Sequence, residues 1–181
     1  NVLKAAGRDI AYQRARGANG EKIAELTELN PGDYEYVDAG FASEEDVAAL
    51  AAKYPDGLAG KFVLVSRGEL TYSAKIDNIA PLKPAGILVY NNVPGEELLV
   101  MSLTTSSVPA AFISLESGQA MLAAADHHLT LVDGKTITPN SNYSMSDFSA
   151  WGVSPDLRLK PEVSAPGGNI YSAVPGGTYE F

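Results

Sequence analysis

Residues 61–68 read KFVLVSRG and residues 87–92 read ILVYNN. Each is a short apolar run, rich in β-branched side chains, that ends in polar or glycine residues. Such runs are typical of strands buried on both faces of a sheet. Between them, residues 73–79 have a helical pattern, which Pro81 and Pro84 must end or kink. The two stretches therefore predict buried strands joined by a short helix.

Turn and capping signals divide the neighbouring sequence into short elements. Ser43 with the acids after it predicts a helix to about Lys53, and Ser114 predicts the cap of a helix over 116–125. Further strands are expected over residues 34–39, 98–103, 109–114, 129–133 and 135–138, the last two paired across Asp133-Gly134. We therefore expect an α+β fold with a β-rich barrel or sandwich and a few short helices.

The first residues allow two interpretations. Ala18-Asn19-Gly20 between polar-apolar stretches predicts a hairpin within residues 8–28, because Asn-Gly favours tight hairpin turns. The alternative is a helix from Val2 to Arg16, which Gly7 and the glycines at 17 and 20 weaken. We expect the hairpin.

Length, composition and charge exclude several classes of protein. The chain has 181 residues, of which 45% are hydrophobic and 19% charged, as expected for one globular domain with appended pieces. The net charge is −9 and no basic block exists, which argues against a nucleic-acid partner. No apolar stretch approaches the roughly 18 residues of a membrane span, so we expect no membrane-embedded segment. Cysteine is absent, which excludes disulfides and thiolate chemistry.

No catalytic or metal-binding pattern emerges from the residues alone. His127 and His128 are adjacent, so their side chains point in different directions and lack a partner at the usual ligand spacing. A Gly-x-Ser-x-Gly nucleophile elbow and a phosphate-binding glycine loop are both missing. We expect no catalytic residue, no metal site and no cofactor in this chain.

The C-terminal stretch carries the most specific motifs. Residues 146–152 read SDFSAWG, residues 159–167 read LKPEVSAPG and residues 170–172 read IYS. In this order they resemble the subtilisin-like serine protease segment F-S-S-x-G, K-P-[DE]-[IV]-x-A-P-G and I-x-S. In that family the nucleophilic serine follows within a few residues. The chain also begins with Asn1 rather than Met, and we expect it to be a piece of a larger protein.

The central part resembles the protease-associated (PA) domain that large cell-envelope subtilases carry as an insertion. The matching stretches are LAGKFVLVSRG (58–68), YSAKIDN (72–78), AGILVYNN (85–92) and VPAAFIS (108–114). They resemble L-x-G-K-[IV]-x-L-[IV]-x-R-G, F-x-x-K-x-x-N, A-G-x-[IV]-x-[IV]-Y-[ND]-N and V-P-A-x-x-I-S. One departure is that Pro81 and Pro84 interrupt the A-x-x-A-G-A stretch with which the family usually continues its middle helix.

The resemblance implies a domain organisation and a function. Residues 1–30 would be the segment or hairpin by which the chain leaves the catalytic domain, residues 31–138 the PA domain, and residues 139–181 an extended, β-like and incomplete catalytic-domain segment. The parent would be an extracellular serine endopeptidase, secreted or attached to the cell wall, with its triad outside this chain. Its partners would be protein or peptide substrates and the remainder of the protease. The PA domain would guide or restrict the access of substrates and mediate protein contacts. The acidic stretch 23–139, with a net charge of −10, would favour basic substrate segments.

Three loops after expected strands are the candidate contact sites, because binding residues concentrate on loops held by a rigid sheet. They span residues 67–71, 91–97 and 104–108. The candidate residues are Arg67, Glu69, Asn91, Asn92, Glu96, Glu97, Thr104 and Thr105. Two alternatives remain, an independent extracellular binding module and the PA domain of a metallopeptidase or membrane receptor.

Overall fold

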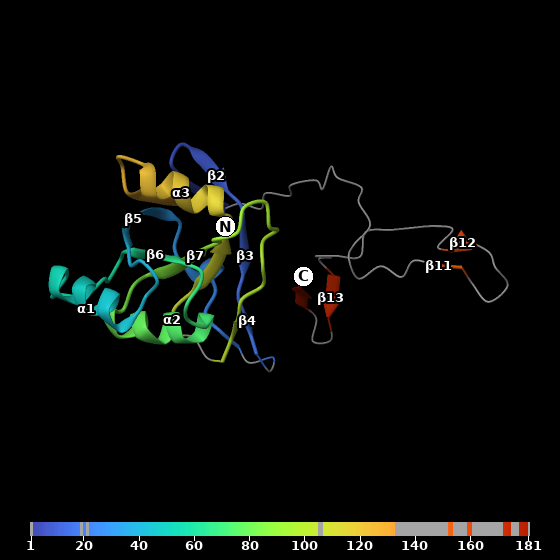
Figure 1. Ribbon diagram of the computed structural model, residues 1–181, viewed down its shortest axis with the longest axis horizontal. Coiled ribbons are helices and arrows are strands. Elements are labelled where there is room, and N and C mark those ends of the chain that lie inside the picture. The colour runs from blue at the N-terminus through green and yellow to red at the C-terminus, as the bar shows by residue number, and fades with distance from the viewer. Residues whose placement is uncertain are drawn as a thin grey trace. The chain divides into compact units, whose positions relative to one another are not determined.

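The computed structural model describes residues 2–18, 20, 22–104 and 107–132, and four short strands beyond them. The chain divides into two compact units, Asn1–Thr136 and Ile137–Phe181. The first unit holds the sheet and helices that carry the candidate loops (Figure 1). No helix in the described part of the chain has the length and apolar composition of a membrane span.

Eight strands form one sheet in the order β2-β1-β10-β5-β6-β7-β9-β3. The strands are β1 (Val2–Ala5), β2 (Arg8–Ile10), β3 (Tyr12–Arg14), β5 (Gly32–Asp38), β6 (Phe62–Ser66), β7 (Gly86–Tyr90), β9 (Ala110–Ile113) and β10 (His128–Val132). The central strands β5, β6, β7 and β9 are parallel, and the others join antiparallel.

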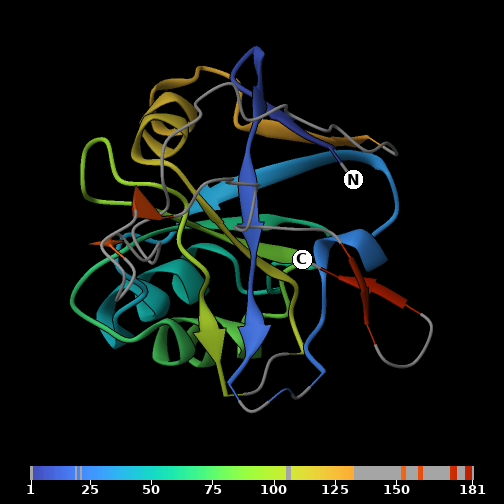
Figure 2. The same cartoon turned by 90° about the vertical axis from the view of Figure 1, so that its right-hand side faces the viewer.

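The sheet curls into a nearly closed barrel because one extended segment lies at both of its ends. β2 and β3 occupy opposite ends of the strand order, yet only Ala11 separates them in sequence. The first half of this segment pairs with β1 and the second half with β9, as the long blue strand in Figure 2 shows. This closure confirms the predicted α+β fold with a β-rich barrel and a few short helices.

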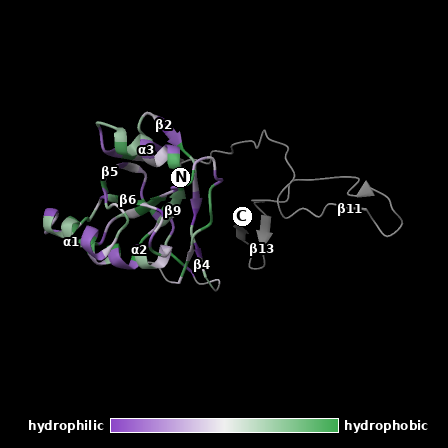
Figure 3. Cartoon of the chain, viewed as in Figure 1, coloured by the Kyte–Doolittle hydropathy of each residue, from purple (hydrophilic) through white to green (hydrophobic). Residues whose placement is uncertain are grey.

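Helices cover both faces of the parallel strands. They are α1 (Glu44–Lys53), α2 (Tyr72–Ile79) and α3 (Leu115–Ala123). Along β6, Val63 and Val65 belong to one apolar cluster with α1 and α2, whereas Phe62 and Leu64 belong to a second cluster with α3. Figure 3 shows this pattern as apolar colour along the central strands and alternating colours on the helices. Burial on both faces explains the unbroken apolar runs that decide the fold.

A side-chain cap begins each α-helix, and the caps of α1 and α3 lie at the predicted residues. Ser43 accepts a hydrogen bond from the amide of Asp46, whose carboxylate accepts one from the amide of Ser43 in return. Thr71 caps α2 and Ser114 caps α3 in the same manner. After Ile79, α2 passes into the 3-10 helix η2 (Ala80–Leu82), as the prolines predict.

The predicted Asn-Gly hairpin is wrong, and so is its helical alternative. The hairpin in this region joins β1 to β2, through a two-residue turn in which Ala6 and Gly7 have φ of 50° and 72°. Further on, β4 (Arg16–Gly17) pairs in parallel with β8 (Ser102–Leu103), while residues 22–25 have no regular structure and η1 (Leu26–Glu28) follows. A distant strand thus takes the hydrogen bonds that a local hairpin would have made.

The remaining expectations have mixed outcomes. The strand predicted over residues 98–103 is limited to β8. The hairpin arm predicted over 135–138 lies outside the described residues. The second unit contains two antiparallel pairs, β11 (Gly152–Val153) with β12 (Leu159–Lys160) and β13 (Ser172–Val174) with β14 (Thr178–Glu180).

The register places the ends of the barrel sequence and the candidate loops at opposite edges of the sheet. Val2 of β1 lies opposite Val132 of β10, and Leu131 lies opposite Gly32 at the start of β5. The parallel strands therefore begin at the edge where β1 begins and β10 ends. They end at the other edge, which we call the distal edge.

Candidate functional site

Three loops at the distal edge form the candidate site. They follow β5, β6 and β7 and span residues 39–43, 67–71 and 91–97, which we call the distal rim. The carboxyl ends of adjacent parallel strands bring such loops together, and ligands of open α/β sheets bind at this kind of edge. Sequence reasoning predicted the second and third of these loops but missed the first.

A network of polar side chains ties the loops after β6 and β7 together. The side chain of Arg67 donates to Oδ1 of Asn91 at 2.9 Å and pairs with the carboxylate of Glu96. Asn91 is fully buried, and its Nδ2 donates to Glu96 at 2.7 Å. Its Oδ1 also accepts from the amides of Asn92 and Val93 at 2.8 and 3.2 Å. Asn91 is therefore the centre that gives the 91–97 loop its shape.

The same network sets the ionisation of Glu96. The hydrogen bond from Asn91, reinforced by the Arg67 guanidinium, holds the pKa of the Glu96 carboxyl below its ordinary value, although desolvation opposes the shift. The side chains of Arg67 and Glu96 are 28% and 33% exposed. Their charges are directed at each other, so Glu96 is an internal part of the rim and not a free surface acid.

A buried lysine and an asparagine of α2 fix the loop after β5. Lys75 is fully buried, and its Nζ donates to the carbonyl oxygen of Phe41 at 2.6 Å. Asn78, one turn further along α2, donates to the carbonyl oxygen of Ala42 at 2.9 Å. Burial lowers the pKa of Lys75, while the carboxylates of Glu69 and Asp46 counteract that shift. These two donors are the lysine and asparagine of the K-x-x-N motif, which therefore acts as a latch on this loop.

The three rim loops come together around Gly68. A Cβ atom on Gly68 would lie 3.6 Å from a ring carbon of Phe41 and 3.2 Å from Nδ2 of Asn92, and the φ of Gly68 is 110°. Both the close approach and the backbone angle favour glycine here. Phe41 from the first loop and Asn92 from the third thus flank the second loop.

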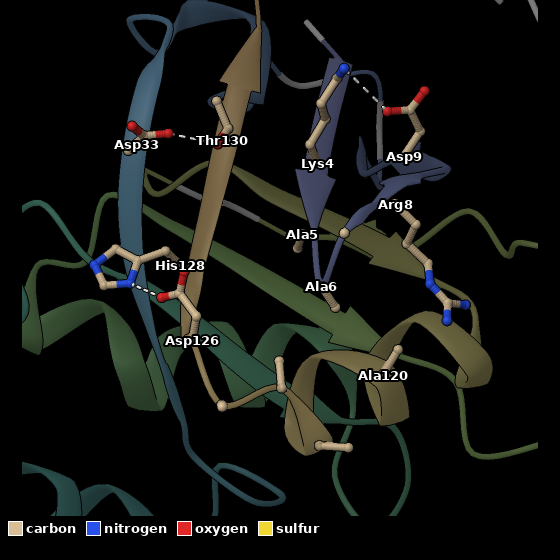
Figure 4. A pocket seen from close by; sticks show the side chains of 14 residues that line it. Lys4, Ala5, Ala6, Arg8, Asp9, Asp33, Ala120, Asp126, His128 and Thr130 are labelled. Carbon is tan, nitrogen blue, oxygen red and sulfur yellow. Dashed lines mark hydrogen bonds and ion pairs between the residues drawn. The ribbon is translucent and has the colours of Figure 1, made fainter.

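A separate hollow of about 1220 Å³ lies between the β1–β2 hairpin, β10 and the end of α3. Figure 4 shows that its charged groups are largely paired with one another, Lys4 with Asp9 at 3.6 Å and His128 with Asp126. His127 turns elsewhere and stacks on Tyr36, with ring centroids 5.2 Å apart. Within the described residues, no group of three acidic or histidine side chains is arranged to hold a metal ion.

Comparison with known protein families identifies the family of the region that contains the rim loops. The PA domain family matches residues 32–121, which run from the start of β5 into α3. This chain carries a PA domain. The matched range contains all three rim loops, and it confirms the resemblance drawn from the strand and K-x-x-N motifs.

The sequence relatives of this PA-domain chain are proteases. It is 31% identical to the minor extracellular protease Vpr of Bacillus subtilis over 167 residues, covering 91% of this chain and 20% of that protein. It is 32% identical to the PII-type proteinase of Lacticaseibacillus paracasei, covering 76% and 8%, and 29% identical to a C5a peptidase of Streptococcus pyogenes, covering 81% and 12%. The chain thus spans a fifth or less of each of these relatives.

A solved structure resembles the PA domain as well. A zinc aminopeptidase from Bacillus subtilis matches with a TM-score of 0.54 and 26% identity, over 71% of this chain and 28% of that chain. The PA fold therefore recurs as a part of larger peptidases of different names.

The predicted contact residues of the PA domain have different surroundings. Arg67, Asn91 and Glu96 form one network, with Asn92 beside it. Glu69 and Glu97 are exposed and have no hydrogen-bond or ion-pair partner within the described residues. Thr104 instead bonds to Ser73 of α2, at 3.0 Å between the hydroxyl oxygens, and Thr105 lies outside the described residues. Sequence reasoning missed Phe41, which contacts Lys75 of the K-x-x-N motif through its carbonyl oxygen.

Proposed function

We propose that this chain is the accessory PA-domain region of a secreted subtilisin-like serine endopeptidase, where it guides or restricts the access of protein substrates. The observation that carries the proposal is the alignment with an extracellular protease over 91% of the chain, together with the PA match over residues 32–121. The subtilase motifs of residues 146–172 support the same assignment.

The geometry of the barrel supports an inserted domain. Val2 and Val132 lie opposite each other on paired strands, so the two ends of the barrel sequence are adjacent. Adjacent ends allow a domain to be inserted into another without stretching either. We propose that residues 1–30 are the segment by which the chain enters from the catalytic domain, although they also supply β1 to β4 to the same compact unit. Residues 31–138 would then be the PA domain and residues 139–181 the return to the catalytic domain, and we place the parent outside the cell, secreted or attached to the wall.

The distal rim is the proposed contact surface for substrates, since it lies at the edge away from these ends. Within it, Glu69, Asn92 and Glu97 are exposed and available to a partner, whereas Arg67, Asn91 and Glu96 shape the loops. Thr104, which bonds to Ser73 of α2, extends the proposed surface, and Thr105 stays a proposed contact from its sequence alone. The acidic net charge favours protein partners over nucleic acid.

The test is to replace residues 3–131 of the intact protease with a short Gly-Ser linker, which the adjacent ends of the barrel permit. We expect hydrolysis of a short chromogenic peptide to continue while the relative rates on different protein substrates change, because the PA domain meets only the larger substrates. If the rate on each protein substrate were the same before and after the replacement, the proposal would be contradicted. The isolated chain should neither cleave casein nor react with a fluorophosphonate probe.

A PA domain of a metallopeptidase is the second candidate, and the structural match to a zinc aminopeptidase favours it. The two candidates differ in the chemistry of the parent. Labelling of the parent by a fluorophosphonate, with activity that survives EDTA, is expected for the serine protease. Loss of activity in EDTA without labelling would establish the metallopeptidase instead.

A further inference from the structure

Half of the exposed large apolar side chains in the described residues lie at the distal rim. Six large hydrophobic residues are exposed in the described part of the chain, and three of them are Phe41, Leu70 and Val93, at 37%, 37% and 43%. Each comes from a different rim loop and lies within two residues of the place where Phe41 and Asn92 flank Gly68. Each rim loop therefore contributes one exposed apolar side chain to the same edge of the barrel.

Phe41 is exposed and also rigidly held. Its amide donates to the Asp46 carboxylate at 3.0 Å, and its carbonyl accepts from Lys75 at 2.6 Å. The ammonium of Lys75 lies 5.5 Å from the centre of the Phe41 ring. The two hydrogen bonds hold the Phe41 backbone in place, so less of the loop has to be ordered when the ring binds a partner, and aromatic anchors dominate protein interfaces.

The charged side chains of the rim loops that form no ion pair are acidic. The three rim loops contain Glu69, Glu96 and Glu97 but only one basic residue, Arg67. Arg67 is committed to Glu96 and Asn91, and the buried Lys75 to the backbone of Phe41. Glu69 and Glu97 have no hydrogen-bond or ion-pair partner within the described residues, although the Glu69 carboxylate acts electrostatically on Lys75. The surface presented to a partner is therefore apolar and acidic.

We propose that Phe41, Leu70 and Val93, with the carboxylates of Glu69 and Glu97, dock an extended protein segment that carries an apolar side chain next to lysine or arginine. The apolar side chain packs on the Phe41 ring, and the basic side chain pairs with the free carboxylates. The position of the rim at the edge away from the barrel ends leaves it open to such a segment. The proposal deepens the proposed function and rests on it, because the segment is taken to belong to a protein substrate.

The test is a nuclear magnetic resonance titration of the isotope-labelled full chain with a short Gly-Ser peptide that carries a central Leu-Lys-Leu-Lys. We expect its addition to shift the amide signals of residues 40–42, 68–70 and 92–93. Two matched peptides, with glutamate in place of lysine or serine in place of leucine, should bind at least about fivefold more weakly. Added salt should weaken the binding of the lysine peptide, since exposed charges act over about 10 Å at 0.1 M salt.

Matched variants separate the apolar from the charged contribution. Phe41→Ala should weaken binding at least about fivefold, whereas Leu122→Ala on α3, a residue with the same 37% exposure, should leave it unchanged. Glu69→Lys with Glu97→Lys should abolish the preference for the lysine peptide. Asp56→Lys, in the exposed turn after α1, is the charge control. The spectrum of each variant shows directly whether the fold is retained.

Several results would overturn this inference. Shifts that map to another face, equal binding of the glutamate peptide, or unchanged binding by Phe41→Ala would each do so. Rim signals that move with protein concentration alone would instead identify a second copy of the chain as the occupant. If the titration fails while the linker replacement changes protein hydrolysis, only the docking inference is lost. If the titration succeeds and the replacement changes nothing, the proposed function is lost.

Discussion

The carboxylate of Glu96 holds together the loops that follow β6 and β7. It accepts from both Arg67 and the buried Asn91, and each of these also contacts the other. A lysine at position 96 would face Arg67 and remove both contacts, so it would disturb the loop and not merely reverse a surface charge. Glu97, its neighbour, has no such partner within the described residues and is the residue at which charge can be changed alone.

Glu96→Gln should lower the thermal midpoint at neutral pH. The pKa of the Glu96 carboxyl is lowered in the folded chain, so the stability it contributes is present above its ordinary value of 4.5 and is lost as the pH falls through its folded value. The difference in thermal midpoint between the unchanged chain and the variant should therefore shrink on acidification. Thermal melts from pH 7 downward measure it, with Glu97→Gln as control. A difference that stays constant with pH, or that Glu97→Gln reproduces, would contradict this assignment.

At the residue scale the sequence predicted two of the three rim loops but not the role of each residue. Glu96 and Glu97 are equivalent in sequence, and only the burial of Asn91 makes the first of them structural. Phe41 follows a strand in a short Gly-Phe-Ala stretch that carries no binding motif. Its importance arises from Lys75, which lies 34 residues further along the chain, and no local pattern reports that contact.

The helices and central strands follow from local chemistry. Ser43, Thr71 and Ser114 cap their helices through side-chain oxygens, and these signals are visible in the sequence. The hairpin prediction near Asn19 failed because the backbone of Arg16 donates to Met101, at 2.8 Å, and not to a neighbouring segment. Elements made by neighbouring residues could thus be predicted, whereas pairing with a distant strand could not.

The latch from α2 should control the motion of the loop after β5. Lys75→Met and Asn78→Ala each remove one hydrogen bond to consecutive carbonyls of Phe41 and Ala42. We expect backbone order parameters of residues 40–42 to fall from about 0.85 towards 0.6 while the helix stays ordered. Asp77→Ala is the control, because Asp77 is exposed on the same helix. Unchanged order parameters in both latch variants would show that the loop is held by other contacts.

At the scale of the whole molecule, barrel closure separates the ends of the barrel sequence from the rim. The segment of β2 and β3 joins both ends of the sheet, and the pairing of β1 with β10 places Val2 opposite Val132. The parallel strands then carry their loops to the other edge. A protein into which this barrel is inserted can hold it at one edge and leave the apolar and acidic rim free at the other.

The most direct measurement is kcat/KM of the intact protease that carries Glu69→Lys and Glu97→Lys, on a lysine-rich unfolded protein and on a short chromogenic peptide. If the rim meets protein substrates, the value for the protein should fall roughly threefold or more at low salt and recover at high salt. The value for the peptide should not change, and Asp56→Lys should affect neither. Equal values for the protein substrate at low salt, with and without the two lysines, would contradict the account.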